Sequence, residues 1–359
     1  MRDTFVHEDN PKSVMSTGVV EDENSKVLER MLCQLSDVEK NTAARSSYHY
    51  LVTSTLSSSD PLNEVRDMQA KVMIGRYLAV EQKLKGSKTI NEKEATALAK
   101  LKETLEYRAQ MNVDELRMCF NSYTDVLVSN HNRCSNVDEK VGAAEDNYKT
   151  GDDCILSGDT CKNDIREYYR KIISSQLAKK ASVVFGYTKD KRAIFSIFPR
   201  FQFEWDKEYF LLENIYMLER AMACTERRTN GATSKVAVMF DYSGYTFKNT
   251  PPIPVAKELL FVLRDHYPGC IQNVYVVDAP FIFQAFWAVV KYFIDPITKE
   301  LVKFVSGDKA KEEVFGKIVD VEEAMPWILP GGEKSEHEQI NMQAFLTETA
   351  FDRAYDDEE

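Results

Sequence analysis

Apolar residues recur at helical spacing in the first third of the chain. Residues 66–84 place Met68, Val72, Ile74, Leu78 and Leu84 at near-helical intervals. A second stripe with a 3.6-residue period runs over 92–111, after a start at Asn91. Residues 1–24 are polar and are expected to be a flexible lead-in. The pattern predicts an all-helical N-terminal module over residues 25–120.

From Ile165 onward, short apolar runs alternate with amphipathic stretches. The apolar runs predict strands, and the amphipathic stretches predict helices between them. Alternation of this kind is typical of an α/β fold with a mostly parallel sheet. The expected strands are 182–187, 193–198, 236–240, 273–279 and 301–306, and the expected helices are 166–179, 208–225, 254–266 and 280–294.

Acidic residues gather in two segments that lack an apolar period. Residues 121–165 carry a net charge of -5 and residues 333–359 a net charge of -7, out of -11 for the whole chain. We interpret them as an acidic insertion or linker and an acidic C-terminal tail, both exposed to solvent. The overall charge disfavours nucleic acid as a partner. The rest of the chain is near neutrality, which is compatible with transient contact with an anionic membrane surface.

Neither the cysteines nor the histidines form a metal-binding motif. Seven cysteines at irregular spacing include no CxxC pair, and the five histidines show no HxxxH or HExxH spacing. No metal and no cofactor are therefore expected. The N-terminus has no apolar signal region, so the sequence predicts a cytoplasmic protein with peripheral membrane association.

The stretch from His266 to Val305 is the most specific part of the chain. It contains Tyr267-Pro268, then Asp278-Ala279-Pro280 after a strand, an aromatic-rich helix, and the turn Asp295-Pro296-Ile297-Thr298. Supporting motifs are Phe240-Asp241-Tyr242-Ser243-Gly244, Met325-Pro326 before Gly331-Gly332, and Tyr107-Arg108 in the N-terminal module.

Together these motifs resemble the CRAL-TRIO family of lipid-binding and lipid-transfer proteins, over residues 66–120 and 178–332. The resemblance implies a mostly parallel sheet as the floor of a hydrophobic pocket, covered by helices. One of these helices is a mobile gate, and a helical module precedes the fold. We expect this lipid-binding domain at residues 166–332.

The segment 281–294 is apolar nearly all round a helix. Fourteen residues rise about 21 Å as a helix, too little to cross a hydrocarbon core of about 30 Å. On residues alone it is either an ordinary core helix or a helix at a membrane interface. The resemblance favours the gate. On one face Trp287 and Lys291 are predicted to contact the membrane. On the opposite face, the residues predicted to close over a ligand are Ile282, Phe286, Val290 and Phe293.

The remaining predicted ligand contacts are Val236, Val238, Phe240, Val276 and Thr298. Family members that exchange phosphatidylinositol hold its headgroup with an Arg in the module, a Glu after the YP pair and a T-x-x-K sequence. At those positions this chain keeps only Thr298; the others are Glu81, Gly269 and Leu301. A buried phosphodiester without a cation is costly. A neutral or weakly polar hydrophobic ligand is therefore expected.

Three functions compete. The leading one is a non-enzymatic, monomeric lipid carrier or sensor that exchanges its ligand at membranes. An α/β hydrolase or nucleotide enzyme is disfavoured, because the chain has no GxSxG, GxxxxGK[ST] or post-strand GxGxxG motif and no catalytic residues can be assigned. An adaptor could recruit protein partners through the acidic insertion and tail, together with the first function.

Overall fold

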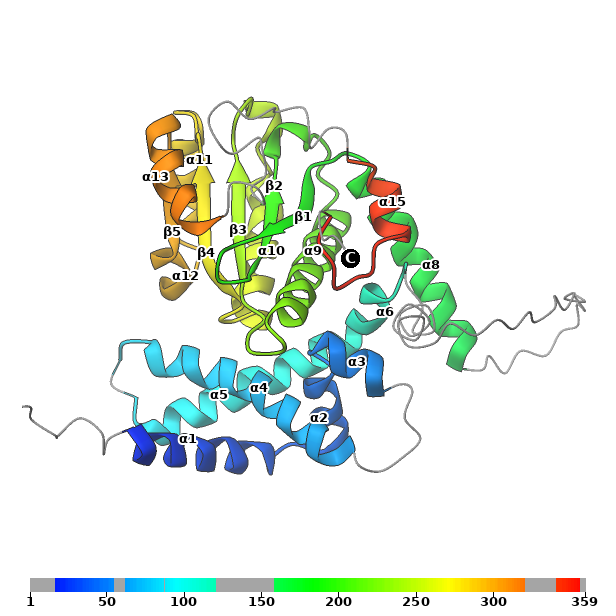
Figure 1. Cartoon of the computed structure of the whole chain (residues 1–359), viewed down its shortest axis with the longest axis vertical. Coiled ribbons are helices and arrows are strands. Elements are labelled where there is room, and N and C mark those ends of the chain that lie inside the picture. The colour runs from blue at the N-terminus through cyan, green and yellow to red at the C-terminus, as the bar shows by residue number, and fades with distance from the viewer. Residues whose placement is uncertain (1–16, 55–61, 87, 121–157, 320–339, 356–359) are drawn as a thin grey trace, which may run out of the picture.

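The computed structural model describes residues 17–54, 62–86, 88–120, 158–319 and 340–355. Figure 1 shows a helical module below a domain built around one sheet. The predicted insertion, residues 121–165, lies outside the described residues up to 157. Its last residues are part of a helix that begins at Gly158.

The module has a hydrophobic core of its own. Its long helices α4 and α5 confirm the two predicted helices, although Met68 and Val72 of the first stripe are 55% and 50% exposed. Leu32, Ile74 and Leu101 are among the residues buried between the helices of the module. Reciprocal capping boxes start two helices, through Ser36 with Glu39 and Thr89 with Glu92. The helices are α1 (Thr17–Leu32), α2 (Asp37–Ala44), α3 (Tyr48–Ser54), α4 (Leu62–Lys83), α5 (Ile90–Gln110) and α6 (Val113–Arg117).

The expected flexible lead-in, residues 1–24, is wrong for its last part, because α1 begins at Thr17. Residues 1–16 lie outside the described residues. Val27, Met31 and Leu32 of α1 are buried against the module core. Burial of these three side chains stabilises the helix through tertiary packing.

The sheet confirms the predicted mostly parallel α/β fold. Its five strands follow one another in the order β1-β2-β3-β4-β5, with the first pair antiparallel and the other three pairs parallel. The bounds are β1 (Ser182–Tyr187), β2 (Ala193–Ile197), β3 (Val236–Asp241), β4 (Ile271–Val277) and β5 (Val302–Val305).

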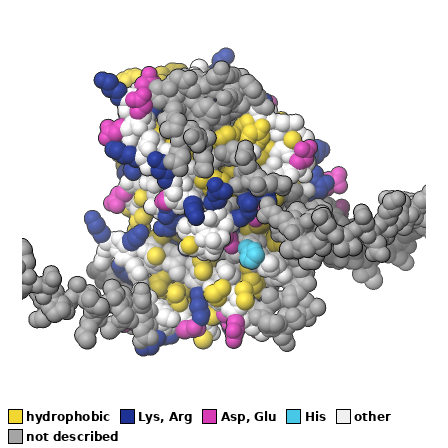
Figure 2. All heavy atoms as spheres, viewed as in Figure 1, with side chains coloured by type: hydrophobic (Ala, Val, Ile, Leu, Met, Phe, Trp, Pro, Cys, Tyr) yellow, Lys and Arg dark blue, Asp and Glu magenta, His cyan; other side chains and the backbone are white. Residues whose placement is uncertain are grey.

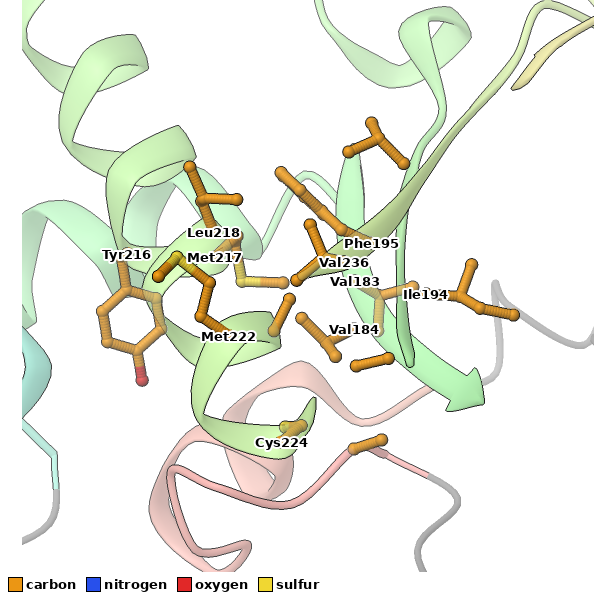
Figure 3. Packing of buried hydrophobic residues seen from close by; sticks show 14 of the residues in the cluster. Val183, Val184, Ile194, Phe195, Tyr216, Met217, Leu218, Met222, Cys224 and Val236 are labelled. Atoms are coloured by element: carbon orange, nitrogen blue, oxygen red, sulfur yellow. The ribbon is translucent and has the colours of Figure 1, made fainter. Parts of the chain in front are cut away.

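Helices cover both faces of this sheet. The central helix α9 packs on β1, β2 and β3, where Met217, Leu218 and Met222 meet strand residues in the core (Figure 3). On the other face, Phe315 of α13 packs on Tyr275 with ring centroids 5.4 Å apart. The bounds are α8 (Gly158–Leu177), α9 (Lys207–Arg228), α10 (Ile253–His266), α11 (Phe283–Val290), α12 (Pro296–Glu300), α13 (Asp308–Ile318) and α15 (Met342–Thr347), with short 3-10 turns η1 (Pro199–Phe201) and η2 (Phe247–Asn249).

The interpretation of residues 333–359 as a solvent-exposed tail is wrong for the segment 340–355. Met342, Phe345 and Phe351 are buried in the main core, and the segment lies beside α8 (Figure 1). Arg220 of α9, 0% exposed, donates to the carbonyl oxygens of Phe345, Thr349, Ala350 and Arg353. Its guanidinium also lies 3.7 Å from the Phe345 ring centroid. Acidic residues dominate the composition of this segment, but its apolar residues complete the core.

A buried ionic cluster joins the module to the sheet domain. Glu219 of α9 accepts from Arg108 of α5 at 2.5 Å and from the Tyr267 hydroxyl at 3.0 Å, and pairs with Arg117 of α6 at 3.3 Å. Burial alone raises the pKa of Glu219, but Arg108 and Arg117 hold it below its ordinary value. Beside this cluster, Tyr107 stacks on His266 with ring centroids 3.9 Å apart. The Tyr107-Arg108 pair thus fixes the module to the helix and turn that precede β4.

Basic side chains also gather along this junction on the face drawn in Figure 2. The near-neutral body of the chain is therefore not uniform in charge.

Candidate functional site

A cavity of about 1030 Å³ lies between one face of the sheet and the helices α9, α10 and α11, with α4 at one end. This volume is at the upper end of the range for ligand pockets, roughly 300–1,000 Å³. The residues that line the cavity along this part of the chain are Val238 and Phe240 of β3, Lys235 just before the strand and Tyr242 just after it. At about 3.3 Å per residue, the cavity extends over some 20 Å, enough for an elongated molecule.

The period of the strands makes the cavity floor apolar. Phe195, Val238, Phe240, Val274 and Val276 point into the cavity from three neighbouring strands. The alternate residues Ala237, Met239 and Tyr275 point to the opposite face, toward α13. Both faces of these strands are therefore apolar. One face packs toward α13, and the other lines the cavity.

The structure brings together most of the residues predicted to contact the ligand. Those that line the cavity are Val238, Phe240, Val276, Phe286, Val290, Phe293 and Thr298. Val236 does not line it. Val236 is on the same face of β3 as Val238 and Phe240, but it is 0% exposed and lies in the packed core of Figure 3, where α9 covers the sheet.

The helix predicted as the gate is shorter than expected, and the residues that it directs into the cavity are not all the expected ones. The regular helix α11 runs only from Phe283 to Val290, eight residues, and Ile282 at its N-cap lies outside the cavity lining. Phe283 points inward instead. It is buried, with its ring centroid 4.4 Å from that of Tyr242. The stretch 291–294 forms turns before Asp295 caps α12.

The predicted membrane-contact residues Trp287 and Lys291 line the cavity as well. Trp287 is half-buried, with its ring 5.3 Å from that of Phe304, so a purely outward position for it is wrong. The apolar residues that do face solvent here are Phe281, 83% exposed, and Tyr292, 76% exposed, with Val289 between them. The buried face of α11 therefore differs from the expected one, since its buried residues are Phe283 and Val290.

One end of the cavity, at the amino ends of the strands, is basic. Lys83 of α4, Lys100 of α5 and Lys235 before β3 line it, and Lys100 pairs with Glu81 at 2.5 Å. Burial, and then the charges of Lys83 and Arg192, lower the pKa of Lys235. No local sequence pattern indicates this group, because its members come from segments far apart in the chain.

The Tyr267-Pro268 turn brings α4 to this end. Gly269 has φ +68°, and a Cβ there would lie 3.4 Å from Val80 of α4. Arg76 of α4 also donates to Cys270 Sγ at 3.3 Å and to Ser46 Oγ at 3.1 Å. A Glu in place of Gly269 would be strained and crowded, which gives a physical reason for its absence.

The other end, at the carboxyl end of β2, holds a buried carboxyl group. Ser182 is the register partner of Ile197 at that end, and its hydroxyl donates to Glu213 Oε1 at 2.7 Å. Glu213 is 3% exposed and lines the cavity. Burial raises its pKa to about 7, opposed by Ser182 and by the charge of Lys179.

This raised pKa predicts a pH-dependent effect of Glu213→Gln on stability. Because the folded state binds the proton more tightly than the unfolded chain, wild-type stability falls as pH rises from 4.5 to 7. The amide has no such penalty. Relative to wild type, the variant should therefore gain roughly 3 kcal/mol of unfolding free energy over that interval, and no more above it. Urea unfolding of both proteins between pH 4.5 and 8.5 measures this, and parallel curves would contradict the assigned burial.

Neither a metal centre nor a membrane span is found in the described part of the chain. Its His, Cys, Asp and Glu side chains form no group of three that could hold a metal ion. None of its helices combines the length and the apolar character needed to cross a bilayer.

Comparison with known proteins agrees with this geometry. Residues 177–323 match the CRAL/TRIO domain family, which confirms the predicted resemblance. "Phosphatidylinositol transfer protein CSR1" of Eremothecium gossypii is 29% identical over 150 residues, 40% of this chain and 32% of that protein. "Phosphatidylinositol transfer protein PDR17" of Saccharomyces cerevisiae is 26% identical over 122 residues, 33% of this chain and 34% of that protein. The matched region thus spans about a third of these relatives.

A solved structure shares the fold over a longer stretch. The crystal structure of Sfh5 superposes with a TM-score of 0.50 and 13% identity, covering 91% of this chain and 98% of that one. At this identity the match supports the fold alone.

Proposed function

Given a CRAL/TRIO domain at residues 177–323, we propose that this protein is a non-enzymatic lipid-binding protein that exchanges one hydrophobic ligand at membranes. The observation that carries the proposal is the cavity of about 1030 Å³ with its apolar floor on β2, β3 and β4. Such a hollow provides an apolar environment in which one alkyl or polycyclic molecule leaves water. In this proposal the protein works in the cytoplasm and contacts membranes only transiently.

The proposed gate is α11 with the turns that follow it, residues 281–294. Phe286, Trp287 and Val290 close the cavity from this side. Phe281, Val289 and Tyr292 expose apolar surface on the other side, beside the cations Lys291 and Lys299. An apolar surface flanked by lysines suits the interface of an anionic membrane. Contact there favours an open gate if opening brings further apolar residues of this segment into the membrane interface.

The first test is chemical. Organic extraction of the purified protein followed by mass spectrometry should find about one lipid molecule per chain. Protein that contains no lipid and takes none up from vesicles would contradict the proposal.

Replacing Phe286 with Asp should lower lipid transfer between vesicles by roughly tenfold or more. The substitution puts a carboxylate into the apolar lining, where burial without a partner costs several kcal/mol. Transfer of a fluorescent phospholipid between donor and acceptor vesicles measures the rate. Phe247→Asp is the matched control, because Phe247 is 72% exposed and does not line the cavity. Equal transfer by both variants would refute the gate.

The headgroup preference is a separate question. Two relatives are named as phosphatidylinositol transfer proteins. Here the corresponding charged positions are Glu81, Gly269 and Leu301, and Glu81 is already paired with Lys100. We propose a neutral or weakly polar ligand, with Lys83 and Lys235 facing the membrane surface or a lipid phosphate at the basic end. The lipid identified by extraction decides between these ligand classes.

A further inference from the structure

Glu213 carries an oxygen atom that the folded chain leaves without a partner. Ser182 occupies Oε1, whereas Oε2 is buried and accepts no hydrogen bond from the described residues. A buried acceptor without a donor costs roughly 1–3 kcal/mol, and more when it is charged. The atom itself is covered, but Glu213 lines the cavity, and a small rotation of its carboxyl group presents Oε2 to a molecule bound there.

Neighbouring polar groups on this side of the cavity are already engaged. Asn249 Nδ2 donates to the carbonyl oxygens of Arg200 and Gln202, and Asn214 Nδ2 donates to that of Phe210. The Tyr245 hydroxyl is bonded to Thr250. Lys179 directs its ammonium to Gln176 and Glu204 instead of to the carboxyl group.

We propose that Glu213 binds the hydroxyl group of a lipid alcohol, whose hydrocarbon body fills the apolar cavity toward the basic end. This assignment rests on the proposed function and adds the chemical class of the ligand and its orientation. The alcohol donates its proton to Oε2, which completes the hydrogen bonding of the carboxyl group while Ser182 keeps Oε1.

The charges and the lining select this class over others. A phosphate or carboxylate would meet a like charge at Glu213 in a buried site. A hydroxyl costs far less to remove from water than an ammonium does. Phe195, Leu218, Val238 and Phe240 line the same cavity with hydrocarbon and offer a polar headgroup no partner. A molecule with one terminal donor and an apolar body satisfies both parts of the lining.

The experiment is a competition between two compounds that differ in one proton. The intact protein is incubated at pH 8 with an equimolar mixture of 1-octadecanol and its methyl ether, and the bound compounds are counted by mass spectrometry. Wild type should retain the alcohol over the ether by roughly tenfold, because only the alcohol can donate to a carboxylate. The ether keeps the same hydrocarbon body.

Three variants separate the hydrogen bond from packing. Glu213→Leu should bind both compounds with little preference, and Glu213→Gln, which keeps the shape of the side chain, should show a preference well below that of wild type. Glu313→Gln is the matched control, since Glu313 is 73% exposed and does not line the cavity, and this variant should keep the preference. A thermal melt identifies any variant that does not fold, in which case Glu213→Gln decides.

The total amount bound and the ratio of the two compounds report on different claims. If wild type binds both compounds equally, or if Glu213→Gln keeps the full preference, the assignment to Glu213 is wrong and the proposed function stands. If wild type binds neither compound but contains or takes up another lipid, this assignment is wrong and the proposed function stands; if it takes up no lipid at all, both are contradicted.

Discussion

Replacing Glu219 with Ala is expected to lower the free energy of unfolding by roughly 3–5 kcal/mol, because it leaves buried cations without their counter-charge. Glu219 is 1% exposed and serves Arg108, Arg117 and the Tyr267 hydroxyl at once. Arg108 has no other ion pair among the described residues. Chemical denaturation monitored by circular dichroism measures the change.

An exposed ion pair provides the control for this prediction. Glu313 and Lys317 on α13 lie 3.2 Å apart with both side chains 73% exposed. Glu313→Ala should change stability by less than about 1 kcal/mol, because solvent screens the pair. Similar losses for the two substitutions would show that Glu219 does not hold the module to the sheet domain.

Ending the chain at residue 339 is the second large perturbation. It removes α15 and the turns after it, including the buried side chains of Phe345, Leu346 and Phe351. The core residues that these side chains cover then become exposed. The truncation also removes every carbonyl oxygen to which Arg220 Nη2 donates. A buried cation that keeps only the Tyr216 hydroxyl as an acceptor among the described residues, together with an uncovered apolar surface, should lower the melting temperature by about 10 °C or more.

A shorter truncation separates packing from charge. A chain ending at Tyr355 loses four acidic residues, Asp356 to Glu359, and keeps all of the described contacts of α15. Its melting temperature should equal that of the full chain within about 2 °C. If the long truncation melts at the same temperature as the short one, the segment 340–355 does not contribute to the core.

The strands of this fold were predictable because burial on both faces makes them short continuous apolar runs. Each predicted strand lies within two residues of the observed one at either end. The helices α2 and α3 were not predicted, since α2 has few apolar residues and α3, with seven residues, is too short to show a helical period. Their buried residues are covered only when α4 and α9 are in place. The segment 340–355 was misinterpreted for a related reason. Its acidic residues dominate the local composition, while Phe345 and Phe351 are buried by helices from elsewhere.

The same distinction between local sequence pattern and packing of distant elements applies to the candidate site. Strand alternation predicts the positions of Val238 and Phe240, because a period of two holds wherever the strand is regular. Alternation also puts Val236 on this face, but it does not show that α9 covers this position, where Val236 is packed in the core instead of lining the cavity. The two polar ends of the cavity combine residues from separate elements, Ser182 with Glu213 and Lys83 with Lys235. Only the packing of those elements brings such groups together.

The strand order also explains where a ligand can enter this fold. Since β2 to β5 follow one another in sequence, right-handed crossovers place α9, α10 and α11 on the same face of the sheet. The succession never reverses direction, so the sheet has no switch point at which loops diverge into a crevice beyond the strand ends. The cavity lies instead between the sheet and the helices α9, α10 and α11 that cover this face. In the proposed function, we expect a ligand to enter by displacement of α11, so that the rate of exchange depends on that movement.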